Sequence, residues 1–221
     1  MERRPLTRER ILDAALALME AEGLGAVTMR RLGRELGVEA MSLYNHVADK
    51  DDVLAGIQER VMAELEIAEA TGDWVERLRA MARTFRALLI RHPGLVALLS
   101  SHAGRPLTDP RALRPIEVVL QTLRGAGLSE DDTVHAYRTL VGFVMGNAVL
   151  EIGGFFGEWG EREGWPDATT MAAQLPAEEL PTIVSMLPSL WSCDATTEFE
   201  RGLDVLLEGL RSRLMATPAD G

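Results

Sequence analysis

Three side chains that can form hydrogen bonds stand in a row at Tyr44, Asn45 and His46. They belong to the stretch "GVEAMSLYNHVADKDD", residues 37–52, which lies between two hydrophobic runs. The only lysine of the chain, Lys50, follows four residues after His46. A dense group of polar side chains beside a single cation suggests a surface that binds a polar, negatively charged partner.

The residues of this stretch match the contacts by which proteins read base pairs in the major groove. Asn45 can pair with adenine through two hydrogen bonds, and Ser42 can bond either base edge. The apolar side chains of Ala40 and Met41 can touch the methyl group of a thymine. The residue types therefore favour the recognition of double-stranded DNA.

Two short helices are expected to position these side chains. The pattern predicts helices at about residues 28–36 and 39–46, joined by a tight turn at Gly37-Val38, which is the spacing of a helix-turn-helix. The apolar side chains that face the first helix of the chain are Leu32, Leu36, Val38, Leu43 and Val47. With these turned inward, the polar side chains face solvent, and Arg30, Arg31 and Arg34 lie on the solvent side of the earlier helix.

Lys50 is predicted in the first turn of a fourth helix, which Asp49 caps with Asp52 in a capping-box arrangement. The free backbone N–H groups and the dipole of a helix N-terminus favour an anion. A phosphate docked there would be held by both the amides and the ammonium group.

The rest of the chain is also predicted to be helical, because apolar residues recur at three- and four-residue steps and no strand alternation is found. Capping residues predict the remaining helix starts, and they are Thr7, Thr28, Asp73, Asp109 and Ser129. Helices are expected to break at His92-Pro93 and to end at Gly125 and Gly127. Residues 157–194 hold four prolines and are predicted as a long connection around one short helix. The fold class is therefore all-α.

Composition excludes several classes of protein. The 221 residues are 47% hydrophobic and carry a net charge of −11, but residues 1–50 balance to zero. The acidic remainder should repel DNA, so binding must be local to the first 50 residues. The single cysteine, Cys193, fits a reducing cytosol, and no export signal or 20-residue apolar span is found. We expect a cytoplasmic protein.

Catalysis and metal binding find little support in the sequence. The histidines are scattered, and Cys193 has no histidine at a spacing that suggests a pair. No glycine-rich phosphate loop or serine elbow is present. We expect no metal, no cofactor and no enzymatic activity. An all-α enzyme and a helical protein-interaction module remain as alternatives, although the latter leaves Arg30, Tyr44 and Lys50 without a role.

The N-terminal region resembles the TetR family of bacterial transcriptional regulators along the stretch "TRERILDAALALMEAEGLGAVTMRRLGRELGVEAMSLYNHVADKDDVLAGI". The positions that match the family pattern are Thr28, Arg30, Leu32, Gly33, Leu36, Gly37, Val38, Leu43, Tyr44, His46 and Lys50. The resemblance implies that Thr28 and Arg30 contact DNA from the second helix, that Ala40, Met41, Ser42 and Asn45 face bases, and that Tyr44, His46 and Lys50 hold phosphates. Because Ala40, Met41 and Asn45 depart from the residues of the tetracycline repressor, a different operator is expected.

The resemblance also implies a division into a helix-turn-helix DNA-binding domain at 1–50 and a helical ligand-binding and dimerisation domain at 51–221. It names the fourth helix, Lys50 to about Ala68, as the lever between the two domains. The apolar positions that could line an effector cavity, with a few polar groups among them, are Phe85, Leu89, Leu99, His102, Leu120, Leu123, Tyr137, Leu140, Val144 and Asn147. Such a lining favours a hydrophobic small molecule. A chelating histidine of the tetracycline repressor is absent near Gly142, so tetracycline is not the expected effector. Asn147 could contact a ligand, a neighbouring backbone or a second protomer.

A homodimer on a palindromic operator is expected, acting as a repressor that the effector releases, with an activator of the same architecture as the alternative. The helix from Ser129 to about Phe156 is apolar nearly all round, so one face needs a partner. The residues predicted at the dimer interface are Gly142, Gly146, Phe199, Leu203, Leu206, Leu207 and Leu210. Two helices from each protomer would pack as a four-helix bundle.

Overall fold

The computed structural model describes residues 5–65, 72–101, 106–155 and 164–216. Within these ranges the chain forms α-helices and one 3₁₀ turn, with no strand, so the all-α class is confirmed. The chain divides into two compact units, Met1–Tyr137 and Arg138–Gly221. The predicted functional boundary after residue 50 falls inside the first unit, because the helices that follow it pack with the N-terminal helices; that boundary stays a prediction.

Every helix start predicted from a capping residue is confirmed. The Thr7 hydroxyl accepts from the Arg10 N–H at 3.3 Å and begins α1 (Arg8–Glu22). The Asp73 carboxylate accepts from Val75 and Glu76 and begins α5 (Trp74–Arg91). Local hydrogen bonds of this kind satisfy the backbone N–H groups that a helix start leaves unpaired.

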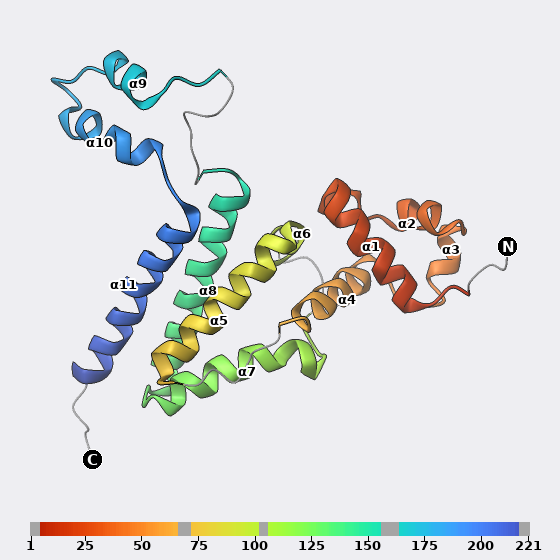
Figure 1. Ribbon diagram of the computed structural model, residues 1–221. Helices are drawn as coiled ribbons and strands as arrows, with labels where there is room; N and C mark the ends of the chain where they lie inside the picture. The colour runs from red at the N-terminus through yellow and green to blue at the C-terminus, as the bar shows by residue number, and fades with distance from the viewer. Residues whose placement is uncertain (1–4, 66–71, 102–105, 156–163, 217–221) are drawn as a thin grey trace. The chain divides into compact units, whose positions relative to one another are not determined.

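The N-terminal part of the first unit packs three helices around a small core. The short turn η1 (Leu24–Ala26) leads from α1 to α2 (Met29–Leu36), and α2 is followed by α3 (Ala40–Leu43). α1 packs against α2 and α2 against α3 (Figure 1). The largest side chains that are fully buried in the first unit include Ile11, Met19, Leu32, Leu43, Ile57, Leu78, Leu89 and Leu95.

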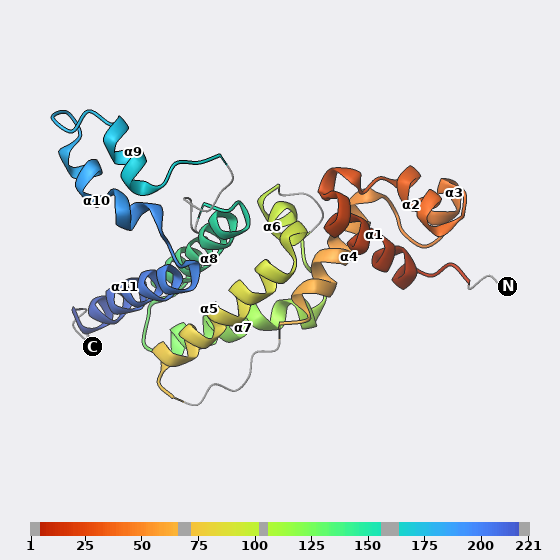
Figure 2. The same cartoon turned by 45° about the horizontal axis from the view of Figure 1, so that its top comes forward.

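α4 (Lys50–Met62) connects these N-terminal helices to the rest of the unit. It packs against α1, against α6 (Pro93–Ser100) and against α7 (Pro110–Gly125), as two views of the chain agree (Figures 1 and 2). The prediction that α4 reaches about Ala68 is wrong, because the helix ends at Met62. Glu64, just beyond this end, pairs with Arg91 of α5, and Ala68 itself lies outside the described residues.

The breaks predicted between the later helices are also confirmed. α5 ends at Arg91 and α6 begins at Pro93, while α7 ends at Gly125 and Gly127 takes a φ of 101°. A glutamate of α4 helps to begin α7: the Glu59 carboxylate accepts from the N–H groups of Thr108 and Asp109 at 2.8 and 3.0 Å. These two hydrogen bonds hold the start of α7 against α4.

α8 (Glu130–Ile152) runs from the first unit into the second, where α11 (Ala195–Ala216) packs on it. The rings of Phe143 and Phe199 lie 5.5 Å apart, and a side chain at Gly202 would collide with Phe143. The missing side chain of Gly202 therefore allows α8 and α11 to approach closely.

The prediction of one short helix within residues 157–194 is wrong, because the described part contains two, α9 (Ala168–Gln174) and α10 (Pro181–Trp191). Pro181 occupies the first turn of α10, where proline needs no N–H partner, so it starts a helix instead of breaking one. The Trp191 indole donates to the carbonyl of Pro166 at 3.0 Å. Among the described residues, no helix is long and apolar enough to cross a membrane.

Candidate nucleic-acid interface and effector site

The turn between α2 and α3 is fixed by two glycines. Gly37 ends α2 with a φ of 68°, a left-handed conformation that glycine adopts without strain. Gly33 lies where the chain returns, and a Cβ added there would be 2.9 Å from the Val38 carbonyl oxygen and 3.1 Å from the Ala40 nitrogen. Only glycine allows α2 to approach the start of α3 this closely.

The inward and outward faces of α3 separate as the sequence predicts. Leu43 is fully buried and Val47 is 3% exposed, whereas Met41 is 73% exposed and Tyr44 is 46% exposed. Asn45 and His46 are exposed as well, and Ala40 and Ser42 are partly exposed. The residues proposed to read DNA thus share one accessible surface.

α3 is shorter than the predicted helix at 39–46. Its α-helical part ends at Leu43, and residues 44–46 form a tighter turn in which each N–H bonds to the carbonyl three residues earlier, as in His46 to Leu43 at 2.9 Å. Such tightening is common at helix C-termini. Tyr44, Asn45 and His46 therefore project from a turn at the end of the helix.

The arginines of α2 have different environments. Arg30 is exposed, whereas Arg31 bonds to Glu35 at 2.6 Å and to Glu22 of α1 at 2.7 Å. These hydrogen bonds, first to Glu35 and then to Glu22, raise the pKa of the Arg31 guanidinium. The expectation that Arg31 faces solvent like Arg30 is therefore only half right: Arg31 holds α2 against α1. Thr28, placed by the sequence at a DNA contact, caps α2 by accepting from the Arg31 N–H at 3.2 Å.

The N-terminus of α4 is held by an ion pair that the sequence did not reveal. Asp49 caps the helix by accepting from the Asp52 N–H at 2.8 Å, and the Asp52 carboxylate accepts from the Ala48 N–H at 2.8 Å. Arg8 of α1 donates to both oxygens of Asp52, at 2.8 and 2.9 Å. No spacing rule links residues 44 positions apart, so this partner could not be found by pattern. Lys50 is partly exposed in the same first turn.

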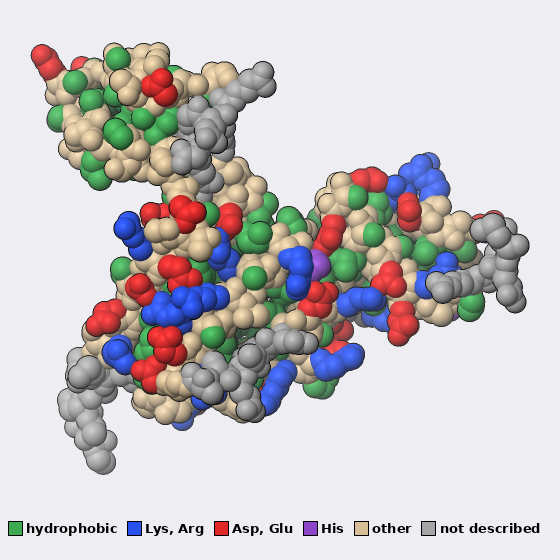
Figure 3. All heavy atoms as spheres, viewed as in Figure 1, with side chains coloured by type: hydrophobic (Ala, Val, Ile, Leu, Met, Phe, Trp, Pro, Cys, Tyr) green, Lys and Arg blue, Asp and Glu red, His purple; other side chains and the backbone are tan. Residues whose placement is uncertain are grey.

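Charges of both signs are mixed over the surface of the N-terminal helices (Figure 3). This distribution agrees with the balanced charge of residues 1–50. The acidic groups of α1 and α2 are partly neutralised by the Arg31 pairs with Glu22 and Glu35. On the face shown, acidic and basic side chains are interspersed, so the cations proposed to meet DNA act at particular positions.

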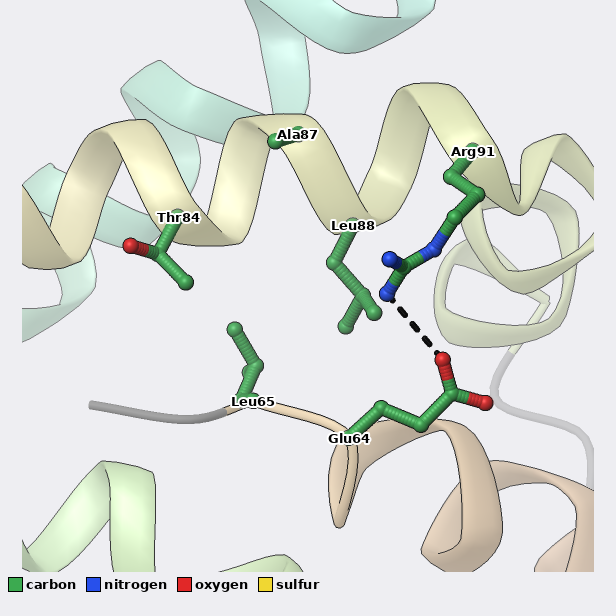
Figure 4. Close-up of a pocket in the computed structure, with 6 residues that line it drawn as sticks. All are labelled: Glu64, Leu65, Thr84, Ala87, Leu88 and Arg91. Carbon is green, nitrogen blue, oxygen red and sulfur yellow. Dashed lines mark hydrogen bonds and ion pairs between the residues drawn. The ribbon is translucent and has the colours of Figure 1, made fainter. Parts of the chain in front are cut away.

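A pocket of about 400 Å³ lies between the end of α4 and α5 (Figure 4). Leu65, Ala87 and Leu88 supply apolar walls, Thr84 lies at one side, and the Glu64–Arg91 ion pair closes the polar end at 3.0 Å. Leu88 was also predicted to line the effector cavity, with Phe85 and Leu89 beside it on α5, but the other residues of this pocket were not predicted.

The polar end of this pocket continues into a cluster that joins three helices. His92, which is 9% exposed, contacts Glu20 of α1 through Nδ1 and Glu64 through Nε2, the latter at 3.3 Å. Arg91 Nε lies 3.2 Å from the same Nε2. A neutral ring can accept from Arg91, whereas a doubly protonated ring donates to Glu64. Either form links α1 to the α5–α6 junction.

The residues predicted for the effector cavity are placed differently in the two units. In the first unit, Leu89 and Leu123 are fully buried, and the residues that are partly exposed are Phe85, Leu99, Leu120 and Tyr137. Burial raises the pKa of the Tyr137 phenol, so its hydroxyl is protonated at neutral pH. His102 lies outside the described residues.

In the second unit, Leu140 and Val144 are buried, at 4% and 1% exposed. The Asn147 amide donates to the Phe143 carbonyl at 3.0 Å. Of the three partners left open for Asn147, a neighbouring backbone group is therefore the one observed. The assignment of these three residues to a ligand stays a prediction.

The predicted dimer residues separate into exposed and buried sets. Gly142 and Gly146 are exposed, and no atom lies within 4 Å of a Cβ built on either. The residues buried inside the protomer, at 0%, 0% and 1% exposed, are Phe199, Leu203 and Leu207. The expectation that these three face a partner is revised, because their side chains belong to the protomer core. Leu206 and Leu210 are partly exposed.

Within the described residues, no group of three or more His, Cys, Asp or Glu side chains is arranged to hold a metal ion.

The environment of the single cysteine disfavours its reactive form. Cys193 is partly buried, and burial, followed by the nearby Glu198 and Asp194 carboxylates, raises the pKa of its thiol. A raised pKa disfavours the nucleophilic thiolate.

Comparison with known families places two matches end to end along the chain. Residues 11–57 match a family described as bacterial regulatory proteins, tetR family. Residues 68–214 match a family described as tetracyclin repressor-like, C-terminal domain. Together the two matches contain the candidate nucleic-acid interface and nearly all of the helices that follow it.

Individual relatives agree with these matches. The HTH-type transcriptional repressor DrrR1 of Streptomyces coeruleorubidus is 35% identical over 213 residues, which cover 93% of this chain and 77% of that protein. Tetracycline repressor protein class D of Escherichia coli is 30% identical over 96% of this chain and 92% of its own length. ActR of Streptomyces coelicolor in complex with actinorhodin aligns with a TM-score of 0.80 at 29% identity, covering 96% of this chain and 99% of that chain.

Proposed function

Because the chain belongs to the tetR family of bacterial regulatory proteins, we propose that it represses transcription by binding an operator as a homodimer, and that a hydrophobic small molecule releases it. The observation that best supports this proposal is the exposed surface of α3 and of the turn that follows it. Leu43 and Val47 anchor this segment inside, while Met41, Tyr44, Asn45 and His46 stand outside. Exposed side chains on a helix that is anchored from behind are what insertion into a major groove requires.

Base reading is assigned to the exposed side chains at the start and end of α3. Asn45 offers an amide that pairs with adenine, and Met41 offers an apolar tip for a thymine methyl group. Ala40 and Ser42 are less exposed and can reach only bases that approach closely. Arg30 contributes from α2, where, among the residues that the structure describes, no ion pair restrains its guanidinium in the way that Glu22 and Glu35 restrain Arg31.

Phosphate binding is assigned to Tyr44, His46 and Lys50, with Thr28 at the start of α2. Lys50 stands in the first turn of α4, where the N-terminus of the helix attracts an anion. The Thr28 hydroxyl already accepts a bond from Arg31, but it can still donate its own proton to a phosphate oxygen. These contacts orient the protein without reading the sequence.

Assembly as a dimer is proposed through the exposed stripe of α8. Gly142 and Gly146 leave the helix backbone open to close approach, and Val149, one turn further, is 48% exposed. Leu206 and Leu210 of α11 are the partly exposed members of the predicted interface. A symmetric pair of such helices would place two recognition surfaces on successive major grooves.

The effector is proposed to be a mostly apolar molecule that contacts the partly exposed side chains Phe85, Leu99 and Leu120, with the Tyr137 hydroxyl as a hydrogen-bonding group. ActR, the relative aligned above, has been solved with actinorhodin and with (S)-DNPA. The lining proposed for this chain favours an uncharged or weakly charged guest. Because α4 packs against α1, α6 and α7, a shift of these helices would move the DNA-reading surface.

A mobility shift assay with DNA from upstream of the protein's own gene tests the central proposal. We expect a retarded complex at nanomolar protein concentration that competing random DNA does not remove. A protein that binds operator and random DNA alike, or neither, contradicts the proposal. The matched variant is Asn45→Ala, which keeps the fold because the side chain is exposed.

Screening compounds by thermal unfolding tests the effector proposal. A ligand present at 100 times its Kd raises the free energy of unfolding by about 2.7 kcal/mol. We expect hydrophobic compounds to stabilise the protein and to release it from DNA, with or without EDTA. An inducer that is a magnesium chelate or a multiply charged metabolite would contradict this assignment.

A further inference from the structure

Arg8 and Asp52 form an ion pair with two hydrogen bonds, which links α1 to α4. Arg8 lies in the first turn of α1, and Asp52 lies in the first turn of α4, directly after Lys50. Both guanidinium branches donate, at 2.8 and 2.9 Å, and such two-point contacts fix direction as well as distance. The contact therefore ties one end of α1 to the turn where a phosphate is proposed to dock.

Gly56, one turn further along α4, makes room for this contact. A Cβ built at Gly56 would lie 3.2 Å from the Arg8 guanidinium and 2.7 Å from the side chain of Leu12. With glycine there, α1 can lie close enough to α4 for Arg8 to reach Asp52. Gly56 therefore leaves the space that the Arg8 side chain needs.

Carboxylates near Lys50 would oppose the binding of a phosphate, and Arg8 offsets the charge of one of them. Asp49, Asp51 and Asp52 surround the proposed phosphate site, and each carboxylate would repel a phosphate if left uncompensated. The hydrogen bond to Asp52 raises the pKa of Arg8, so the guanidinium stays charged at neutral pH. Arg8 is the cation that cancels the Asp52 charge, and Asp52 in turn accepts from the Ala48 N–H.

We propose that Arg8 is a positioning residue for DNA binding: through Asp52 it neutralises and holds the 48–50 turn, so that Lys50 and the backbone N–H groups of α4 can receive a phosphate. This inference rests on the proposed function. In this role Arg8 affects DNA binding through Asp52 and does not contact DNA itself.

The test measures operator affinity of Arg8→Gln against a matched variant. Arg60→Gln removes the other ion pair between α1 and α4, Arg60 to Asp13 at 2.6 Å, which lies in the last turn of α4. Both substitutions remove one positive charge and one link between the same two helices. We expect about tenfold weaker binding for Arg8→Gln, on operator and random DNA alike, and less than twofold for Arg60→Gln.

A double substitution separates the positioning role from a direct phosphate contact. Asp52→Asn removes the repelling charge but keeps an oxygen that can accept from the Ala48 N–H. We expect Arg8→Gln with Asp52→Asn to bind within about threefold of the wild-type protein and to regain its salt dependence. If Arg8 touches DNA itself, the double variant binds no better than Arg8→Gln, and the inference is overturned.

Two further measurements are needed to interpret these results. Thermal unfolding of each variant detects loss of the fold. If Arg8→Gln does not fold, Arg8→Lys, which keeps the charge without the two-point contact, replaces it, and we expect an intermediate loss of affinity. Lys50→Ala reports on the proposed function alone. Weaker binding by Lys50→Ala with unchanged binding by Arg8→Gln overturns only the role of Arg8, whereas no DNA binding by the wild-type protein overturns the proposed function.

Discussion

At the scale of single residues, exposure separates side chains with similar chemistry. Arg30 and Arg31 are neighbours, yet only Arg30 is exposed, because Arg31 bonds to Glu22 and Glu35. On α3, Leu43 is fully buried and Tyr44 is 46% exposed. The DNA-reading role therefore belongs to particular members of each polar group.

Replacing the proposed base-reading side chains should reduce specificity. We expect Asn45→Ala and Arg30→Ala each to weaken operator binding by about 1–3 kcal/mol, because each removes hydrogen bonds to a base edge, with little loss on random DNA. Titration of both DNAs in one buffer measures this. Equal losses on operator and random DNA would show that Asn45 does not read bases.

Replacing the proposed phosphate contact should have a different signature. We expect Lys50→Ala to weaken binding to every sequence and to lower the slope of log affinity against log salt by about one unit, because one phosphate contact is lost. Arg60→Gln, which removes a positive charge far along α4, serves as the control for net charge. A slope that does not change relative to this control removes Lys50 from the phosphate contacts.

At the scale of elements, the crossing of α2 and α3 depends on one glycine. A Cβ at Gly33 would meet the backbone of Val38 and Ala40 at 2.9 and 3.1 Å, and backbone atoms cannot move aside as a flexible side chain can. We expect Gly33→Ala to force the two helices apart, lowering the melting temperature and abolishing operator binding. The control is Gly25→Ala, where a Cβ meets no atom within 4 Å. Normal operator binding by Gly33→Ala would show that the crossing tolerates a side chain.

His92 is one of the side chains that connect α1 to the α5–α6 junction, alongside the packing of Met19 against Gly94. His92 is 9% exposed and contacts Glu20 and Glu64, so its removal leaves two carboxylates without their shared partner. We expect His92→Ala to lower the free energy of unfolding by about 1–3 kcal/mol in denaturant titration. The control is His135→Ala on the exposed side of α8, with a change within about 0.5 kcal/mol. Equal stability of the two variants would remove His92 from the links between helices.

At the scale of the whole molecule, burial changes how the dimer should be tested. Leu203 and Leu207 are 0% and 1% exposed, so a glutamate at either position would unfold the protomer and reveal nothing about assembly. Gly146 is a better probe, because a side chain there meets no atom of its own chain within 4 Å.

We expect Gly146→Glu to convert the dimer to a monomer at micromolar concentration in light scattering, because the charge would be buried against the partner. Gly125→Glu on α7 is the matched control, since it too meets no atom within 4 Å, and it should stay dimeric. A dimer of unchanged mass with Gly146→Glu would place the interface elsewhere. Retained melting temperature in both variants confirms that the protomer is intact.

The sequence by itself determined the features that depend on residues a few positions apart. The Asp49 cap, the Gly37 turn and the break at His92-Pro93 are each decided by hydrogen bonds or backbone restrictions within about one helical turn. The same holds for the inward face of α3, since Leu43 and Val47 are related by helical periodicity. These local rules sufficed for the all-α class and for the exposed polar surface that belongs to a DNA-binding regulator.

Only the tertiary structure decided the features whose partners are distant in sequence. Arg8 and Asp52 are 44 positions apart, and Glu20 and His92 are 72 apart, so no periodic pattern relates them. The pair between Glu64 and Arg91, 27 positions apart, is of the same kind. Likewise, Phe199 and Leu203 read as a stripe that could face either a core or a partner, and the packing of α11 on α8 placed them in the core. Periodicity tells which side chains share a face, but only packing tells what covers that face.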